Sequence, residues 1–70
     1  MKYVIILEPT NTGYSAYSPD VPGCISTGRT KEETERNIRE AIEFHLEGLR
    51  AEGLEVPMPA SEVTFVDIAA

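Results

Sequence analysis

The first thirty residues contain three short runs of the kind that form β-strands. Residues 2–8 (KYVIILE) are apolar at every position from Tyr3 to Leu7. A short run that is apolar on both faces is typical of a strand in the middle of a sheet. Residues 14–18 (YSAYS) and 24–28 (CISTG) are bounded by glycine and proline. We therefore predict three strands, of which the first is central in its sheet.

Turn-forming residues separate these runs. Residues 9–13 (PTNTG) are typical of a hairpin loop. Residues 19–23 (PDVPG) contain two prolines, which cannot donate hydrogen bonds to a sheet. Pro22 and Gly23 fit the two central positions of a type II turn, where only the second residue needs a positive φ. The sequence thus predicts a tight turn directly before Cys24.

The pattern then changes to that of one long helix over residues 31–52. Thr30 and Glu33 have the spacing of a capping box, and Gly53 suits the left-handed position that ends a helix. Residues of one face recur at helical spacing and form the expected buried stripe, with Leu46 at its margin: Thr34, Ile38, Ala41, Ile42, His45 and Leu49.

A proline-bearing connector over residues 56–61 precedes a fourth predicted strand, residues 62–68 (EVTFVDI). The expected order is βββαβ in a single α+β domain over residues 1–70. In that fold a mixed, mainly antiparallel four-stranded sheet carries one long helix on one face. The last strand would return beside the first and parallel to it. Because apolar side chains of the first strand would remain on the uncovered face, we expect a homodimer or a higher oligomer.

Charge and size restrict the partners. Six Lys and Arg against twelve Asp and Glu give a net charge of −6. That charge repels nucleic-acid phosphates and favours a basic protein partner. No apolar stretch approaches the roughly 18 residues of a membrane span, and no secretory signal precedes the first strand. We expect a cytoplasmic protein without membrane contact. Cores below about 70–80 residues are often supported by oligomerisation.

The residues that could carry chemistry are few. Cys24 and His45 are the only thiol and imidazole, so a Cys–His pair is conceivable, but a buried structural role is the favoured interpretation. A βββαβ order also opens ribonuclease H-like folds, whose metal sites need converging carboxylates. Here the first strand has no acid before Glu8, and most acids lie on the outer helix face. We expect no catalytic, metal or cofactor site.

Phe44 and Gly48 are the helix positions that a buried stripe does not explain. Phe44 lies about 120° from Ile38 on the helical wheel. Either the connector or a second chain is therefore expected to cover its ring. Gly48, one turn later, leaves a shallow groove beside Ala41. These two residues are candidates for a contact with a partner or with a second copy.

Several short motifs follow one another along the chain: Gly13-Tyr14-Ser15-Ala16, Pro19-Asp20-Val21-Pro22-Gly23-Cys24, Thr27-Gly28-Arg29-Thr30, Glu32-Glu33, Asn37-Ile38-Arg39-Glu40-Ala41-Ile42 and the exit Val56-Pro57-Met58-Pro59. Taken together, these motifs resemble the HicB-type antitoxin family over about residues 2–68. Arg29 and Thr34 depart from the acid and the alanine that the resemblance leads us to expect at those places.

The resemblance implies a partial ribonuclease H-like domain without nuclease activity. Such a domain binds and blocks a small basic HicA-type toxin, a ribonuclease that cleaves mRNA. Many relatives carry a C-terminal DNA-binding segment; the sequence stops at Ala70 without one, so direct DNA binding is not expected. A free-standing homo-oligomeric module without a toxin is the alternative, and a metal-dependent nuclease is the disfavoured third. The candidate residues for toxin binding or self-interaction are Asp20, Pro22, Gly23, Phe44 and Gly48.

Overall fold

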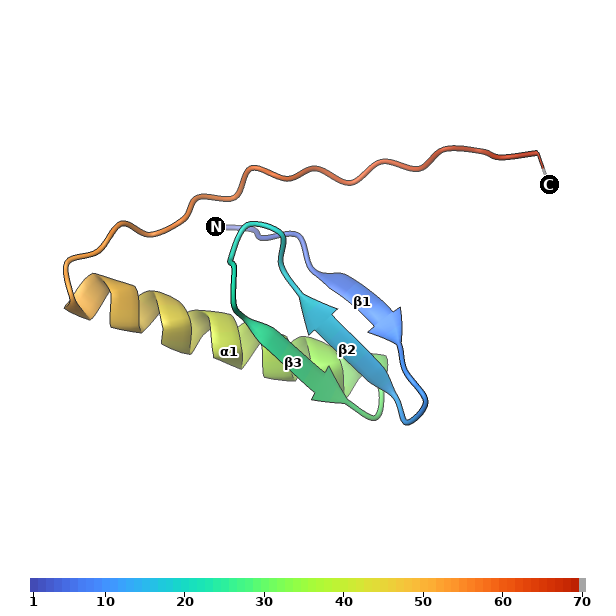
Figure 1. The fold of residues 1–70 in the computed structure, drawn as a ribbon, viewed down its shortest axis with the longest axis horizontal. Coiled ribbons are helices and arrows are strands. Elements are labelled where there is room, and N and C mark those ends of the chain that lie inside the picture. The colour runs from blue at the N-terminus through green and yellow to red at the C-terminus, as the bar shows by residue number, and fades with distance from the viewer. Residues whose placement is uncertain (70) are drawn as a thin grey trace.

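The computed structural model describes residues 1–69 and contains a three-stranded sheet and one helix. The strands are β1 (Ile6–Pro9), β2 (Tyr14–Tyr17) and β3 (Ile25–Gly28), and the helix α1 spans Lys31–Ala51. Neighbouring strands are antiparallel, in the order β1-β2-β3. Figure 1 shows α1 lying across one face of this sheet. The predicted α+β class and three of its strands are confirmed. Ala70, the last residue of the expected domain, lies outside the described residues.

The central strand is β2, and the prediction that the first strand is central was wrong. Tyr17, the last residue of β2, pairs with Ile6, so residues 2–5 extend beyond the end of their neighbour. Ala16 pairs with Leu7 on one side and with Ser26 on the other, and its side chain is fully buried. Within residues 1–69, β1 is therefore an edge strand despite being apolar on both faces.

The turn before β3 has the predicted geometry. The Cys24 amide donates to the Val21 carbonyl over 3.4 Å, which closes a four-residue turn with Pro22 and Gly23 at its centre. Gly23 has a φ of +86°, as the second central residue of a type II turn requires. The turn brings Val21 and Cys24 into the core.

Helix α1 begins at a cap that the sequence placed correctly, with one change of partner. The Thr30 hydroxyl accepts from the Glu33 amide over 3.0 Å. In a capping box the Glu33 carboxylate would accept from the Thr30 amide; here it accepts instead from the Arg29 amide over 3.1 Å. Both bonds satisfy amides that have no partner within the helix or the adjoining loop.

The helix ends in a Schellman motif, as Gly53 predicted. Gly53 has a φ of +71°. Its amide donates to the Arg50 carbonyl over 3.1 Å, and the Leu54 amide donates to the Leu49 carbonyl over 2.8 Å. These are the two bonds that define the motif, and they turn the chain out of the helix at Glu52.

The core lies between α1 and the strands β2 and β3. Thr34, Ile38, Ile42 and Leu46 of the helix are buried, whereas three residues expected on the same stripe, Ala41, His45 and Leu49, are only half-buried. The stripe is therefore centred closer to Leu46 than predicted. The buried apolar residues are Ala16, Val21, Cys24, Ile38, Ile42 and Leu46, with Tyr3, Ile5, Leu7, Leu49 and Val56 packed at the margin.

The predicted fourth strand is absent from the described part of the chain. Residues 62–69, called the arm below, pair with no strand and are exposed throughout. The connector before the arm is fixed at two points: the Tyr3 hydroxyl donates to the Pro57 carbonyl over 2.5 Å, and Asp20 binds Ala60 and Ser61. From there the arm leads away from the sheet (Figure 1). The predicted four-stranded sheet does not form, because the chain after α1 passes the turn that contains Asp20 and does not run beside β1.

Candidate protein-binding surface

A groove runs along the β3 side of α1 and has a volume of about 440 Å³. We call it the Phe44 groove. Three of the five residues singled out from the sequence line it, although they come from two distant parts of the chain. Its lining residues are Gly23, Cys24, Ile25, Ala41, Phe44, His45, Gly48, Leu49 and Glu52.

The rim of the Phe44 groove is apolar and exposed. The side chain of Phe44 is 79% exposed and that of Ile25 is 68% exposed. The connector, one of the two expected covers for the Phe44 ring, leaves it open. Gly48 adds depth, because a Cβ atom built there would have no other atom within 4 Å. Large apolar side chains beside a hollow mark a surface that suits a protein partner.

Cys24 and His45 both line this groove, but the thiol has none of the features of a nucleophile. Cys24 is only 7% exposed, and its Sγ donates a weak hydrogen bond to the Ala41 carbonyl over 4.0 Å. Burial raises the pKa of the Cys24 thiol, whereas a reactive cysteine needs a lowered one. The arrangement supports a packing role for Cys24 at the floor of the groove.

Asp20 lies outside the Phe44 groove and holds the connector. Its Oδ2 accepts from the amides of Ala60 and Ser61 over 3.1 and 3.0 Å, and its Oδ1 accepts from the Ser61 hydroxyl over 2.9 Å. The Ser61 and Ala60 amide bonds hold the pKa of Asp20 below its ordinary value. Pro22 is exposed in the turn next to Gly23. Sequence reasoning missed the structural role of Asp20, because its partners lie about forty positions away.

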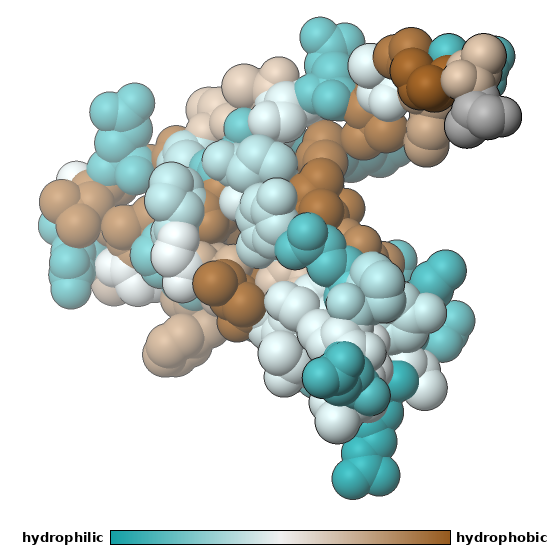
Figure 2. Space-filling model, turned by 45° about the vertical axis from the view of Figure 1, so that its right-hand side comes forward, coloured by the Kyte–Doolittle hydropathy of each residue, from teal (hydrophilic) through white to brown (hydrophobic). Residues whose placement is uncertain are grey.

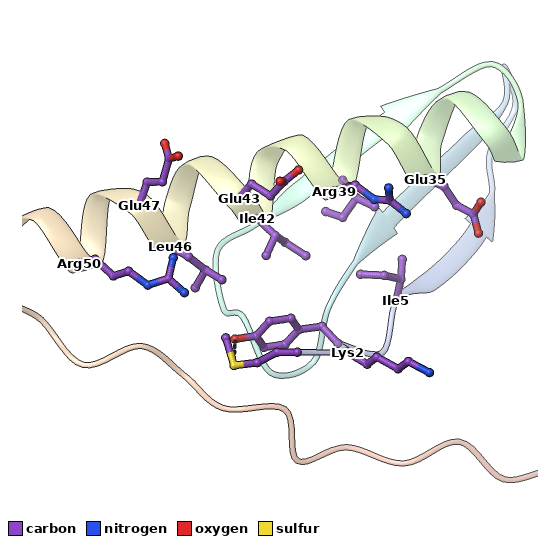
Figure 3. Close-up of a pocket in the computed structure, with 12 residues that line it drawn as sticks. Lys2, Ile5, Glu35, Arg39, Ile42, Glu43, Leu46, Glu47 and Arg50 are labelled. Atoms are coloured by element: carbon purple, nitrogen blue, oxygen red, sulfur yellow. Dashed lines mark hydrogen bonds between the residues drawn. The ribbon is translucent and has the colours of Figure 1, made fainter.

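A second groove, with a volume of about 720 Å³, runs along the opposite side of α1 beside the first residues of the chain. We call it the Tyr3 groove. In Figure 3, Ile42 and Leu46 point from α1 toward the side on which Ile5 lies. None of its residues was predicted as a site; the only signal was the two-sided apolar character of the first strand. The lining residues are Met1, Lys2, Tyr3, Ile5, Glu35, Ile38, Arg39, Ile42, Glu43, Leu46, Glu47 and Arg50.

Two further properties concern ions and membranes. Among residues 1–69, no three His, Cys, Asp or Glu side chains come together in a way that could hold a metal ion. The one helix of the described chain lacks the long apolar stretch that a membrane crossing would need.

The sequence of the chain is similar to those of several known proteins. The chain matches the family model of the HicB-like antitoxin of bacterial toxin–antitoxin systems over residues 3–68. It is 47% identical over 57 residues to an uncharacterized 14.9 kDa protein of Haemophilus phage HP1, covering 81% of this chain and 43% of the phage protein. It is 38% identical over 66 residues to a UPF0150 protein of Thermoplasma acidophilum, covering 91% of this chain and 96% of that protein. The chain thus spans less than half of one relative and nearly all of the other.

Solved structures give the same result for the fold. A structure of the HicA3 and HicB3 toxin–antitoxin complex matches with a TM-score of 0.72 and 35% identity, over 86% of this chain and 70% of that one. A crystal structure of the antitoxin HicB3 matches with the same TM-score and identity, over 86% of this chain and 44% of that one. The sequence match over nearly the whole chain and the shared fold lead to one conclusion: the chain belongs to the HicB-like antitoxin family of bacterial toxin–antitoxin systems.

Proposed function

We propose that this chain is a non-catalytic antitoxin that binds and occludes a small basic HicA-type toxin, a ribonuclease that cleaves mRNA. Family membership and the likeness to a chain from a HicA3–HicB3 complex support a toxin partner. The observation that carries the proposal is the exposed Phe44 groove. It offers a large aromatic side chain at the edge of a hollow, which is the composition of an interface anchor.

Charge favours a basic partner on the same surface. The net charge of the chain is −6. Glu52 lines the Phe44 groove, and Glu40 is exposed on the same helix, four residues before Phe44. A protein that cleaves RNA needs positive charge where phosphates bind, and these carboxylates would meet that surface and steer its approach. Occlusion therefore needs no catalytic group on the antitoxin.

The substitution Phe44→Lys tests the proposal on the purified full chain and a purified HicA-type toxin. It removes the aromatic anchor and places a positive charge opposite a positive surface. We expect the dissociation constant, measured by calorimetry, to rise by about 30-fold or more, the factor that corresponds to the roughly 2 kcal/mol of an interface hot spot. RNA cleavage by the toxin should then no longer be blocked.

Met58→Lys is the matched control, because Met58 is an apolar side chain that is 65% exposed in the connector, outside both grooves. It makes the same change in charge and should leave toxin binding intact. Equal toxin binding by wild type and Phe44→Lys would contradict the proposed surface. Failure of the wild-type chain to bind the toxin would favour the free-standing oligomeric module.

A metal-dependent nuclease remains the third possibility for the family fold. It predicts that the chain alone cleaves RNA when magnesium or manganese is added. We expect no cleavage, and robust metal-dependent activity lost on substitution of Asp20 or Asp67 would overturn the non-catalytic assignment.

A further inference from the structure

The arm has the composition of a strand but pairs with no strand among residues 1–69. Five of the seven residues from Glu62 to Ile68 are β-branched or aromatic, the composition that favours a strand. The arm is already extended, and its apolar side chains are 63–92% exposed. Figure 2 shows the arm standing clear of the body with apolar atoms along it. An isolated apolar strand in water is unstable alone and readily pairs with another edge.

In the described part of the chain, strand β1 has a strand neighbour on only one of its two edges. It bonds to β2 on one side, and its other edge has no partner within residues 1–69. Residues 3–7 are half-buried at every position, so neither face is fully covered. A run that is apolar on both faces is the pattern of a central strand. One more strand beside β1 would supply that missing neighbour.

The Tyr3 groove lies along this same side of the sheet. Helix α1 packs on β2 and β3, which leaves the space between the helix and the start of the chain open. Ile5 lies on one side of that space, with Ile42 and Leu46 on the other (Figure 3). A strand added at the edge of β1 would place its apolar side chains against these three residues.

Charge is compatible with the arm as the occupant. Lys2, Arg39 and Arg50, half of the six cations of the chain, line the Tyr3 groove. Three glutamates of α1 balance them there, whereas the chain as a whole carries −6. The arm contributes Glu62 and Asp67 at the two ends of its apolar segment. The charges that line the groove thus balance, so the groove repels an acidic strand less than the overall charge of −6 would suggest.

The attachment of the arm directs it away from its own chain. The three hydrogen bonds of Asp20 hold Ala60 and Ser61 at the turn between β2 and β3. Beyond Ser61 the arm continues past the body and leaves β1 uncovered (Figure 1). Every copy of the chain therefore has an arm without a neighbouring strand and a β1 edge without a partner, and within residues 1–69 the two do not pair with each other.

We propose that residues 62–68 of one chain add as a strand to the free edge of β1 in a second copy, and that the exchange is reciprocal. Each copy supplies one arm and one groove, so the contact closes on itself as a two-fold dimer. The strand β1 then becomes central in a four-stranded sheet built from two chains. This interface goes beyond the proposed toxin binding and leaves the Phe44 groove free on both copies.

The test compares two phenylalanines that are both exposed, Phe65 in the arm at 92% and Phe44 in the other groove at 79%. Sedimentation equilibrium on the full chain is expected to give twice the chain mass of 7.7 kDa. Phe65→Lys should raise the dimer dissociation constant about 30-fold or more, and Phe44→Lys should leave it unchanged. A wild-type chain that stays monomeric at roughly 100 μM, about 100-fold above a dissociation constant of about 1 μM, would overturn the proposal. So would a dimer that Phe44→Lys breaks and Phe65→Lys does not.

A second variant tests the backbone pairing itself. Thr64→Pro removes an amide from the exposed arm and cannot disturb the folded body, yet proline is excluded from paired strands. We expect it to weaken the dimer as Phe65→Lys does, with the helical circular dichroism unchanged. A dimer of unchanged strength would overturn the strand pairing.

Mixed labelling distinguishes exchange between chains from folding back within one. In a sample that combines isotope-labelled and unlabelled chains, the Phe65 ring should show contacts to the methyl groups of residues 4–6 of the other chain. Contacts only within a chain would overturn the proposal. Toxin binding is measured separately through Phe44→Lys. A result that contradicts the exchange of arms therefore leaves the proposed toxin binding untouched, and the reverse also holds. An arm protected only when the toxin is added would assign it to the toxin instead.

Discussion

Replacement of Gly28 by alanine tests how closely α1 is seated on the end of β3. A Cβ atom at Gly28 would lie 2.6 Å from the Thr34 hydroxyl oxygen and 2.8 Å from the Thr34 amide nitrogen. Thr34 is fully buried. Its hydroxyl and its amide both donate to the Thr30 carbonyl, over 2.7 and 3.0 Å. Thr34 therefore cannot withdraw without breaking the first turn of the helix.

The expected cost follows from these contacts. Overpacking a well-fitted site costs about 1–3 kcal/mol, and a weakened hydrogen bond at Thr34 adds to it. A loss of about 2 kcal/mol would lower the melting temperature by roughly 8–16 °C in a domain of this size. Gly48→Ala is the matched control: the same methyl group meets no atom within 4 Å. Because alanine favours a helix over glycine, it should gain about 0.8–1 kcal/mol.

The assay is urea unfolding followed by circular dichroism at 222 nm. All variants are compared at one protein concentration, since self-association adds to apparent stability. A change of less than about 0.5 kcal/mol for Gly28→Ala, the usual range of a surface substitution, would refute the close seating of α1. Equal destabilisation by Gly48→Ala would show that the effect is not specific to the contact with Thr34.

Two further predictions concern the turn between β2 and β3. Gly23→Val should destabilise the domain by about 1–2 kcal/mol, because Gly23 has a φ of +86° that opposes a β-branched side chain. Gly23→Asn should destabilise the domain less. An unchanged melting temperature for Gly23→Val would count against the type II turn. The second prediction concerns Asp20, whose pKa is lowered by the amides of Ser61 and Ala60. The attachment of the connector is therefore complete above the ordinary carboxyl pKa of about 3.9. It is lost as the pH falls through the lowered pKa of Asp20. The amide chemical shifts of Ala60 and Ser61 should therefore move together only below about pH 4, and Asp20→Asn should shift them at neutral pH; amides that do not respond to either change would contradict the attachment.

The two grooves place the two proposed contacts on opposite flanks of α1. The helix covers β2 and β3 with its buried stripe and leaves a groove on each flank. The groove on the β3 side presents Phe44 and is suited to a foreign partner. The groove on the β1 side accompanies a free sheet edge and is suited to a strand. A small domain with one helix thus has two separate surfaces with different physical character.

The sequence by itself determined the elements whose signals are local. The helix start depends on Thr30 and Glu33, and its end depends on Gly53, all within one turn of the boundary they set. The type II turn is contained in Pro22 and Gly23. Such interactions join residues three to five positions apart, so they form wherever that local sequence occurs. The HicB-type resemblance rests on the same local motifs and was confirmed.

Only the tertiary structure decided which strand is an edge, where the arm goes and which residues share a groove. The apolar pattern of the first strand correctly indicated a need for neighbours but not whether the same chain supplies them. Asp20 accepts a hydrogen bond from Ser61 across 41 positions, and Gly23 lines one groove together with Phe44 and Gly48, with no local signal for either arrangement. These arrangements depend on the orientation of α1 on the sheet. Packing of the whole core sets that orientation, because side chains distant in sequence must fill one shared volume.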